Sequence, residues 1–190
     1  MKTFLTVCLL SAALAASPVL ADPKTKMASY AEAQRADWLT QDTIIAAIRA
    51  QNDQTAAYDQ AQIDALDTTW RSEVGSRESA LISSVITSDA AQVLSDAVDA
   101  SGGVITEVFV MDARGLNVAS SGVTSDYWQG DEAKFQQTFP VGADAVHVAD
   151  VELDESTQAY QGQVSMTISD PATGEPIGAV TFGLNAQSFF

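Results

Sequence analysis

The sequence predicts an α+β domain, with helices in the first half of the chain and an antiparallel sheet in the second. From about residue 26 to 100, apolar residues recur at helical spacing. From about residue 104 to 186, short runs of β-branched and aromatic residues alternate with turn residues. Because helices and strands are segregated, we expect a long N-terminal helix and further helices to pack on a five-stranded antiparallel sheet.

The first 21 residues have the features of a secretory signal peptide. Lys2 precedes an apolar run, and Val19-Leu20-Ala21 places small residues where a signal peptidase cleaves. We therefore expect one domain, residues 22–190, that acts in the periplasm or is secreted. Cys8 lies inside the apolar run and does not fit a lipoprotein anchor. Its removal leaves no cysteine for a disulfide, a metal site or a nucleophile.

Apolar spacing in the first half indicates a series of helices. Trp38, Ile45 and Ile48 recur at helical spacing, and Thr40 is a suitable N-cap. Trp38 and Trp70 are interpreted as core anchors rather than site residues. The later helices are expected over about 58–73, over about 78–86, and from the N-cap Ser88 to Gly102-Gly103.

The second half has the pattern of a hairpin followed by three more strands. Residues 104–111 and 116–120 are predicted to pair, because Asp112-Ala113-Arg114-Gly115 between them is a tight turn. The other strands are expected over about 145–153, 161–169 and 176–185, after a short helix over about 130–138. The strand 161–169 alternates, with apolar side chains such as Val164 on one face and polar ones such as Gln163 on the other.

The segment TSDYWQGDEAKF, Thr124 to Phe135, places two large aromatic residues in a loop. Either Tyr127 and Trp128 close over a ligand, or they only pack against the protein. Asp126 or Asp131 could pair with an amine. Alternatively, Asp131 caps the following helix, whose free N–H groups could receive a carboxylate. These two possibilities require opposite charges on the ligand, and the sequence does not choose between them. Ser120 could line the same pocket from its strand.

Several stretches of the chain share features with one family. They are the hairpin VFVMDARGLNVA, the loop SDYWQGDEAKF, the PIGAV that opens the last strand, and the helical stretches DTIIAAIRAQN and IDALDTTWR. Together they resemble the Cache family of extracellular sensor domains, also called PDC or extracytoplasmic PAS-like domains. The resemblance implies a long N-terminal helix, a five-stranded PAS-like sheet, and a pocket between sheet and loops for organic acids, amino acids or amines.

The sequence departs from the usual setting of that family. Most Cache domains lie between two membrane helices and feed a kinase, a chemoreceptor or a cyclase, whereas no second apolar segment follows here. We therefore expect the domain to act without its own output domain. Its expected partners are a small-molecule ligand and a separate membrane-bound receptor or kinase, with a homodimer through the N-terminal helix as a further contact.

Composition and motifs argue against several other functions. The formal net charge of −16 disfavours nucleic acid and anionic membranes as partners. His147 is the only histidine and is interpreted as structural. The acidic residues between 150 and 155 do not have the spacing of a calcium loop. We expect no catalytic residue, no metal and no cofactor.

Two functions remain from the sequence. The first is an exported, soluble sensor domain that binds a small molecule. The alternative is an interaction protein that docks on a membrane signalling partner and has no ligand of its own.

Overall fold

The computed structural model describes residues 22–38, 41–76, 78–154 and 159–190. The predicted signal peptide, the candidate cap Thr40 and the side chain of Trp38 lie outside what it describes. The elements are α1 (Pro23–Trp38), α2 (Asp42–Thr55), α3 (Gln60–Glu73), α4 (Ala80–Ile86), α5 (Asp89–Ala100), β1 (Ile105–Met111), β2 (Asn117–Ser120), α6 (Ala133–Gln136), β3 (Val146–Val148), β4 (Glu152–Asp154), β5 (Ala159–Ser169), β6 (Pro176–Asn185) and the 3₁₀ helix η1 (Ala186–Phe189). This order confirms the predicted α+β fold.

Local sequence chemistry explains where the helices begin and end. Asp59 and Gln62 form a reciprocal capping box at the start of α3. Ser79 and the predicted Ser88 cap α4 and α5 by accepting a backbone N–H three residues on. After α5 the chain turns through Gly102 and Gly103, both at positive φ. Among the described residues, no helix combines the length and apolar character needed to cross a membrane.

The strands form one antiparallel sheet in the order β2-β1-β6-β5-β3. The predicted hairpin is β1 and β2, with Gly115 of its turn at a φ of 79°. The strand expected over 145–153 is instead two short strands, so the described sheet has six strands rather than five. Both β3 and β4 pair with β5, along the same edge. Between them Asp150 leaves the ladder and forms an ion pair with Lys24 of α1.

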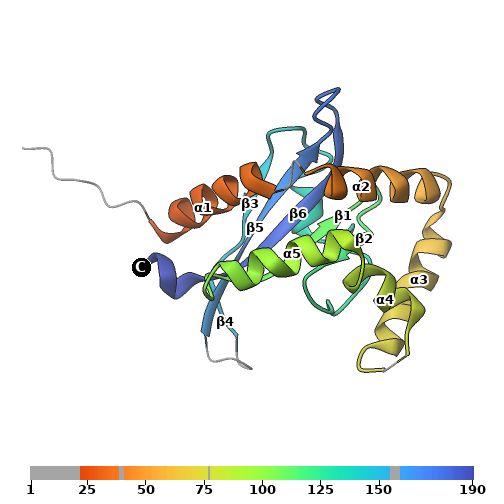
Figure 1. Cartoon of the computed structure of the whole chain (residues 1–190), viewed down its shortest axis with the longest axis horizontal. Coiled ribbons are helices and arrows are strands. Elements are labelled where there is room, and N and C mark those ends of the chain that lie inside the picture. Colours follow the sequence, from red (N-terminus) through yellow and green to blue (C-terminus); the bar gives the residue numbers. More distant parts are fainter. Residues whose placement is uncertain (1–21, 39–40, 77, 155–158) are drawn as a thin grey trace, which may run out of the picture.

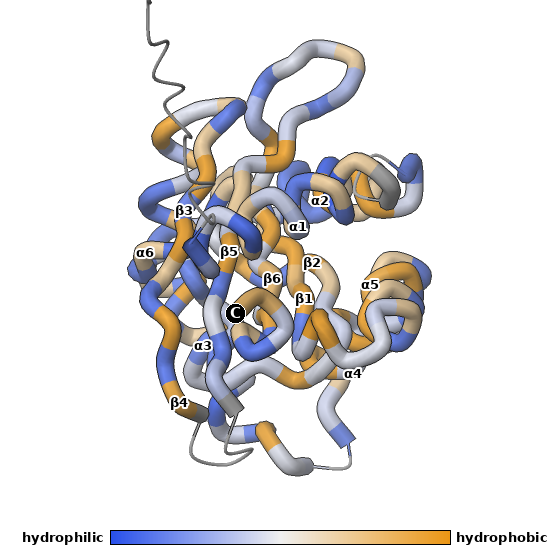
Figure 2. Tube along the Cα trace, turned by 90° about the vertical axis from the view of Figure 1, so that its left-hand side faces the viewer, coloured by the Kyte–Doolittle hydropathy of each residue, from blue (hydrophilic) through white to orange (hydrophobic). Residues whose placement is uncertain are grey.

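The helices cover one face of the sheet and extend past its β2 end. Helices α1, α2 and α5 cross this face, whereas α3 and α4 lie beyond β2 (Figure 1). In the perpendicular view the sheet stands between α2 and α5 on one side and α6 on the other (Figure 2). The main core lies under the helices and includes Ile48, Leu94, Val110, Met166 and Phe182. The short α6 therefore belongs to a separate covering layer.

Candidate binding site on the polar face of the sheet

The face of the sheet that is turned away from α1, α2 and α5 is polar along β5, while β1 contributes Phe109 and Met111 to it. Because side chains alternate along a strand, Val164 and Met166 point to the main core while Gln163 and Ser165 point away from it. Ser165 is fully buried, and its hydroxyl lies 2.9 Å from the hydroxyl of Thr181 on β6. The sequence predicted this alternation, but not that both faces of β5 are covered.

A segment that runs from the end of β2 through α6 covers this polar face. It is held from the side by Asp67 of α3, whose Oδ1 accepts the backbone N–H groups of Tyr127 at 2.9 Å and Trp128 at 3.0 Å. At its other end Phe135 of α6 packs on Phe109 and Met111 of β1. These contacts fix residues 124–136, which we call the covering segment, over the sheet.

A small polar cavity of about 90 Å³ lies between the covering segment and the sheet. The sheet contributes Glu107, Phe109 and Gln163, and the covering segment contributes Asp126, Gln129 and Lys134 among others. Three ionisable side chains, one from β1 and two from the covering segment, therefore meet around one small cavity.

The three charged groups of this cavity differ in how they are paired. The ammonium of Lys134 lies 2.9 Å from a carboxylate oxygen of Glu132 and 5.5 Å from the centre of the Phe109 ring. Asp126 pairs with Arg71 of α3 at 3.3 Å. The carboxylate of Glu107 accepts only the amide of Gln163, at 3.3 Å, and has no cationic partner within the described residues. Among these three groups, Glu107 is the one without an ion pair to a described residue.

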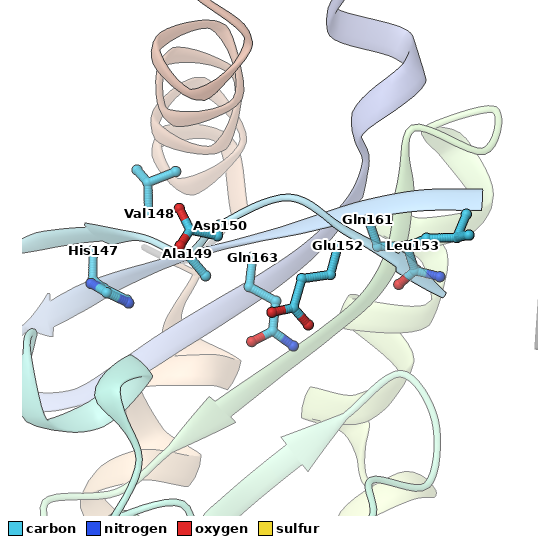
Figure 3. A pocket seen from close by; sticks show the side chains of 8 residues that line it. All are labelled: His147, Val148, Ala149, Asp150, Glu152, Leu153, Gln161 and Gln163. Atoms are coloured by element: carbon cyan, nitrogen blue, oxygen red, sulfur yellow. The ribbon is translucent and has the colours of Figure 1, made fainter. Parts of the chain in front are cut away.

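The cavity adjoins a wider groove of about 520 Å³ along β3, β4 and β5, and Gln163 lines both. In Figure 3 the side chains of His147, Gln163 and Glu152 extend to the same side of these strands, whereas Val148 extends to the other. The groove has the volume of a small-molecule pocket, while the inner cavity holds only a small polar group. Together they provide a deep polar end and an open entrance.

The structure separates the two aromatic residues that the sequence predicted as ligand contacts from this cavity. Tyr127 is buried and stacks on Trp70 of α3, with ring centres 5.5 Å apart. Trp128 is half-buried, and its indole N–H donates to the carbonyl of Arg114 at 2.9 Å. Both pack toward α3 and the β1–β2 turn, and Trp70 is the core anchor that the sequence predicted.

Of the remaining predicted residues, Asp126 alone lines the polar cavity. Ser120 is buried at the end of β2, where its hydroxyl accepts the N–H of Gly122 at 3.4 Å. Asp131 is exposed and does not cap α6, whose N-cap is Glu132 without a side-chain hydrogen bond. Since α6 has only four residues, its start is also a weak site for a carboxylate.

Sequence reasoning missed Glu107, Lys134 and Gln163 as site residues. The signal for Glu107 was a single acidic residue inside the apolar run of β1. Lys134 gave no local signal, because only the fold brings α6 over β1. Within the described parts of the chain, no group of three or more histidine, cysteine or acidic side chains is placed to hold a metal ion.

Comparison with known proteins gives structural similarities only. No protein-family model and no curated protein matches the chain. The ligand-binding domain of the Pseudomonas aeruginosa amino acid chemoreceptor PctC, in complex with GABA, aligns with a TM-score of 0.45 and 13% identity over 88% of this chain and 58% of that domain. The ligand-binding domain of Campylobacter jejuni chemoreceptor Tlp3, with 4-methylisoleucine, aligns with a TM-score of 0.41 and 11% identity over 80% and 64%.

A kinase sensor domain gives a comparable result. The sensor domain of the V. cholerae histidine kinase DctB aligns with a TM-score of 0.39 and 12% identity over 87% of this chain and 58% of that chain. All three are sensor or ligand-binding domains, the class that the sequence resemblance indicated. The chain spans less than two thirds of each of them, and TM-scores below 0.5 assign neither a ligand nor a partner to it.

Proposed function

We propose that this protein is an exported sensor domain of the Cache type that binds a small amine or amino acid at the polar face of its sheet. The ammonium group of the ligand pairs with Glu107 in the inner cavity, and the rest of the ligand occupies the groove toward His147. The observation that carries this proposal is the half-buried Glu107 carboxylate, which lacks a cationic partner among the described residues.

The electrostatics of the site support a cationic group at Glu107. A carboxylate that is withdrawn from water is costly unless a positive charge or several hydrogen bonds compensate it. Lys134 is already paired with Glu132, and Asp126 with Arg71, so Glu107 is left for the ligand. The formal charge of −16 also raises the local concentration of cations around the protein.

The size of the site supports a small ligand. A volume of about 90 Å³ corresponds to roughly three water molecules at about 30 Å³ each. An ammonium group with one or two carbons fits this space, and a longer chain continues past Gln163 into the groove. Phe109 forms an apolar part of the wall of this space.

The function as a sensor requires a partner that reads the ligand. From the family resemblance we propose a separate membrane-bound receptor or kinase. The alternative function, docking without a ligand, is favoured by exposed apolar side chains near the β3–β4 edge, namely Val146, Leu153 and Tyr160.

The proposed function is tested by measuring thermal stability with three matched compounds: butylamine, butyrate and 4-aminobutyrate. The two amines are expected to raise the melting temperature and butyrate is not. A ligand at a hundred times its dissociation constant adds about 2.7 kcal/mol to the free energy of unfolding. Glu107→Gln should remove the response, while Glu175→Gln, an exposed turn residue, should keep it.

Two outcomes would contradict the proposal. One is stabilisation by butyrate alone, which would reverse the charge of the ligand. The other is an unchanged amine response in Glu107→Gln. If no compound of a wider amine and amino acid panel stabilises the protein, docking without a ligand becomes the better explanation.

A further inference from the structure

A second cavity, of about 270 Å³, lies between the helices α2, α3 and α4 and strand β2. It is separate from the polar site, with which it shares no lining residue. Its apolar wall is formed by Leu66 of α3, Leu81 and Val85 of α4 and Val118 of β2. Two tyrosine residues, Tyr58 and Tyr127, complete the wall. The cavity thus combines aliphatic and aromatic surfaces with a few polar side chains, as small-molecule pockets commonly do.

The side chain of Tyr127 brings a hydroxyl group to the wall of this cavity. Tyr127 is 6% exposed, and no described residue forms a hydrogen bond with its side-chain oxygen. Burial raises the pKa of this phenol, and the carboxylates and phenols nearby, Asp112 and Tyr58, raise it further. The group is therefore a protonated phenol, which can donate a hydrogen bond to a ligand in the cavity.

Polar groups on one side of the cavity form a network around Asp112. Asp112 accepts the hydroxyl of Thr55 at 2.9 Å and the amide of Gln51 at 3.1 Å. Gln51 also donates to the carbonyls of Leu116 and Asn117. These contacts join α2 to the β1–β2 hairpin and keep one side of the cavity in place.

The ring of Tyr127 is fixed as well. It stacks on the fully buried Trp70, with an angle of 19° between the ring planes. Asp67 holds its backbone N–H, and the indole N–H of Trp70 donates to the carbonyl of Thr124 at 2.8 Å. The cavity is therefore preformed, which lowers the entropic cost of filling it.

We propose that this cavity is a second binding site, for a small aromatic molecule that carries a hydrogen-bond acceptor. The aromatic ring of the ligand packs against the aliphatic wall, and its acceptor atom accepts a hydrogen bond from the hydroxyl of Tyr127. A cavity of about 150 Å³ with a fully apolar lining is sufficient to bind benzene, whereas this one also has the polar side chains of Gln51, Gln54, Thr55 and Ser84 in its wall. The larger volume here leaves space for a ring with a short acceptor-bearing substituent.

The test uses two probes of the same shape, acetophenone with a carbonyl acceptor and ethylbenzene without one. Binding is followed by the shifts of backbone amide signals in ¹H–¹⁵N spectra of the protein. Acetophenone is expected to shift signals of α3, α4 and Val118 and to bind more tightly than ethylbenzene. Tyr127→Phe should weaken acetophenone about fivefold, as expected for one hydrogen bond, and leave ethylbenzene unchanged.

A pair of substitutions on α4 provides an independent check that does not alter Tyr127. Ser84 is exposed at the margin of the cavity, and Ser83 is an exposed neighbour that does not line it. Ser84→Phe should abolish binding of both probes, while Ser83→Phe should not. The proposal is overturned if neither probe shifts these signals, or if Tyr127→Phe weakens both probes equally.

Binding at this second site is expected to be independent of binding at the amine site. Glu107→Gln should leave acetophenone binding unchanged, and Ser84→Phe should leave the amine response unchanged. A protein that binds acetophenone but no amine would retain the second site and refute the proposed function.

Discussion

The two faces of the sheet are both buried, but by different means. On the helix face Val110, Phe182 and their neighbours are fully buried against apolar residues of α1, α2 and α5. On the other face the hydroxyls of Ser165 and Thr181 are just as buried and are satisfied by each other. Apolar burial stabilises the first face throughout, whereas the second face combines this hydroxyl pair with a smaller apolar cluster around Phe109, Met111 and Phe135. The second face is therefore the one that offers polar side chains to a ligand.

The largest expected effect is on the helix face. Phe182→Ala removes a fully buried ring from the main core and should lower the free energy of unfolding by about 3–5 kcal/mol. Urea denaturation measures this loss. Phe190→Ala, at a ring that is 74% exposed, is the control and should change stability little. A loss below about 1 kcal/mol for Phe182→Ala would mean that the helix face does not carry the stability.

The next effect concerns how the covering segment is held over the polar face. Asp67→Ala leaves the N–H groups of Tyr127 and Trp128 without an acceptor and should cost about 2–3 kcal/mol. Asp67→Asn keeps an acceptor oxygen and should cost less. Asp64→Ala, at an exposed position of the same helix, is the matched control for denaturation measurements. Equal effects of the two alanine variants would show that the segment is held by other contacts.

A smaller effect is expected within the polar face itself. Ser165→Ala leaves Thr181 without its hydroxyl partner and should cost about 1 kcal/mol, as should Thr181→Ala. The double variant should cost less than the sum, because neither hydroxyl is then left unpaired. Additive losses in a double-mutant cycle would contradict the coupling of the two groups.

The smallest effect is a pH dependence at the margin of the helix face. Asp170, next to β5, accepts the guanidinium of Arg49 of α2 at 2.8 Å, and this hydrogen bond lowers the pKa of the carboxyl below its ordinary value of 3.8. Because the pKa is lower in the folded state, the stabilisation is present above pH 3.8 and is lost as the pH falls through the folded value. Arg49→Met should raise the pKa of Asp170 toward 3.8 in an NMR titration. An unchanged pKa would assign the shift to the backbone N–H of Ala172 instead.

Local sequence chemistry was sufficient to predict most of the fold. The cap at Ser88, the glycine turn after α5 and the β1–β2 turn depend on side chains a few residues apart, so they were predictable. The alternation of β5 was confirmed for the same reason. The interruption between β3 and β4 was not predictable, because it accompanies an ion pair between Asp150 and Lys24, which are 126 residues apart.

The sequence by itself determined the fold class, the polar pattern of β5 and the unusual loop around Tyr127 and Trp128. Only the tertiary structure decided where those residues point. Asp126 lies near Glu107 and Lys134 because the covering segment packs over β1. Tyr127 lines a second cavity because Trp70 and Asp67 of α3 hold it there. A binding site depends on which distant side chains share one space. Local patterns determine the helices and strands, whereas the packing of these elements determines which distant side chains share one space.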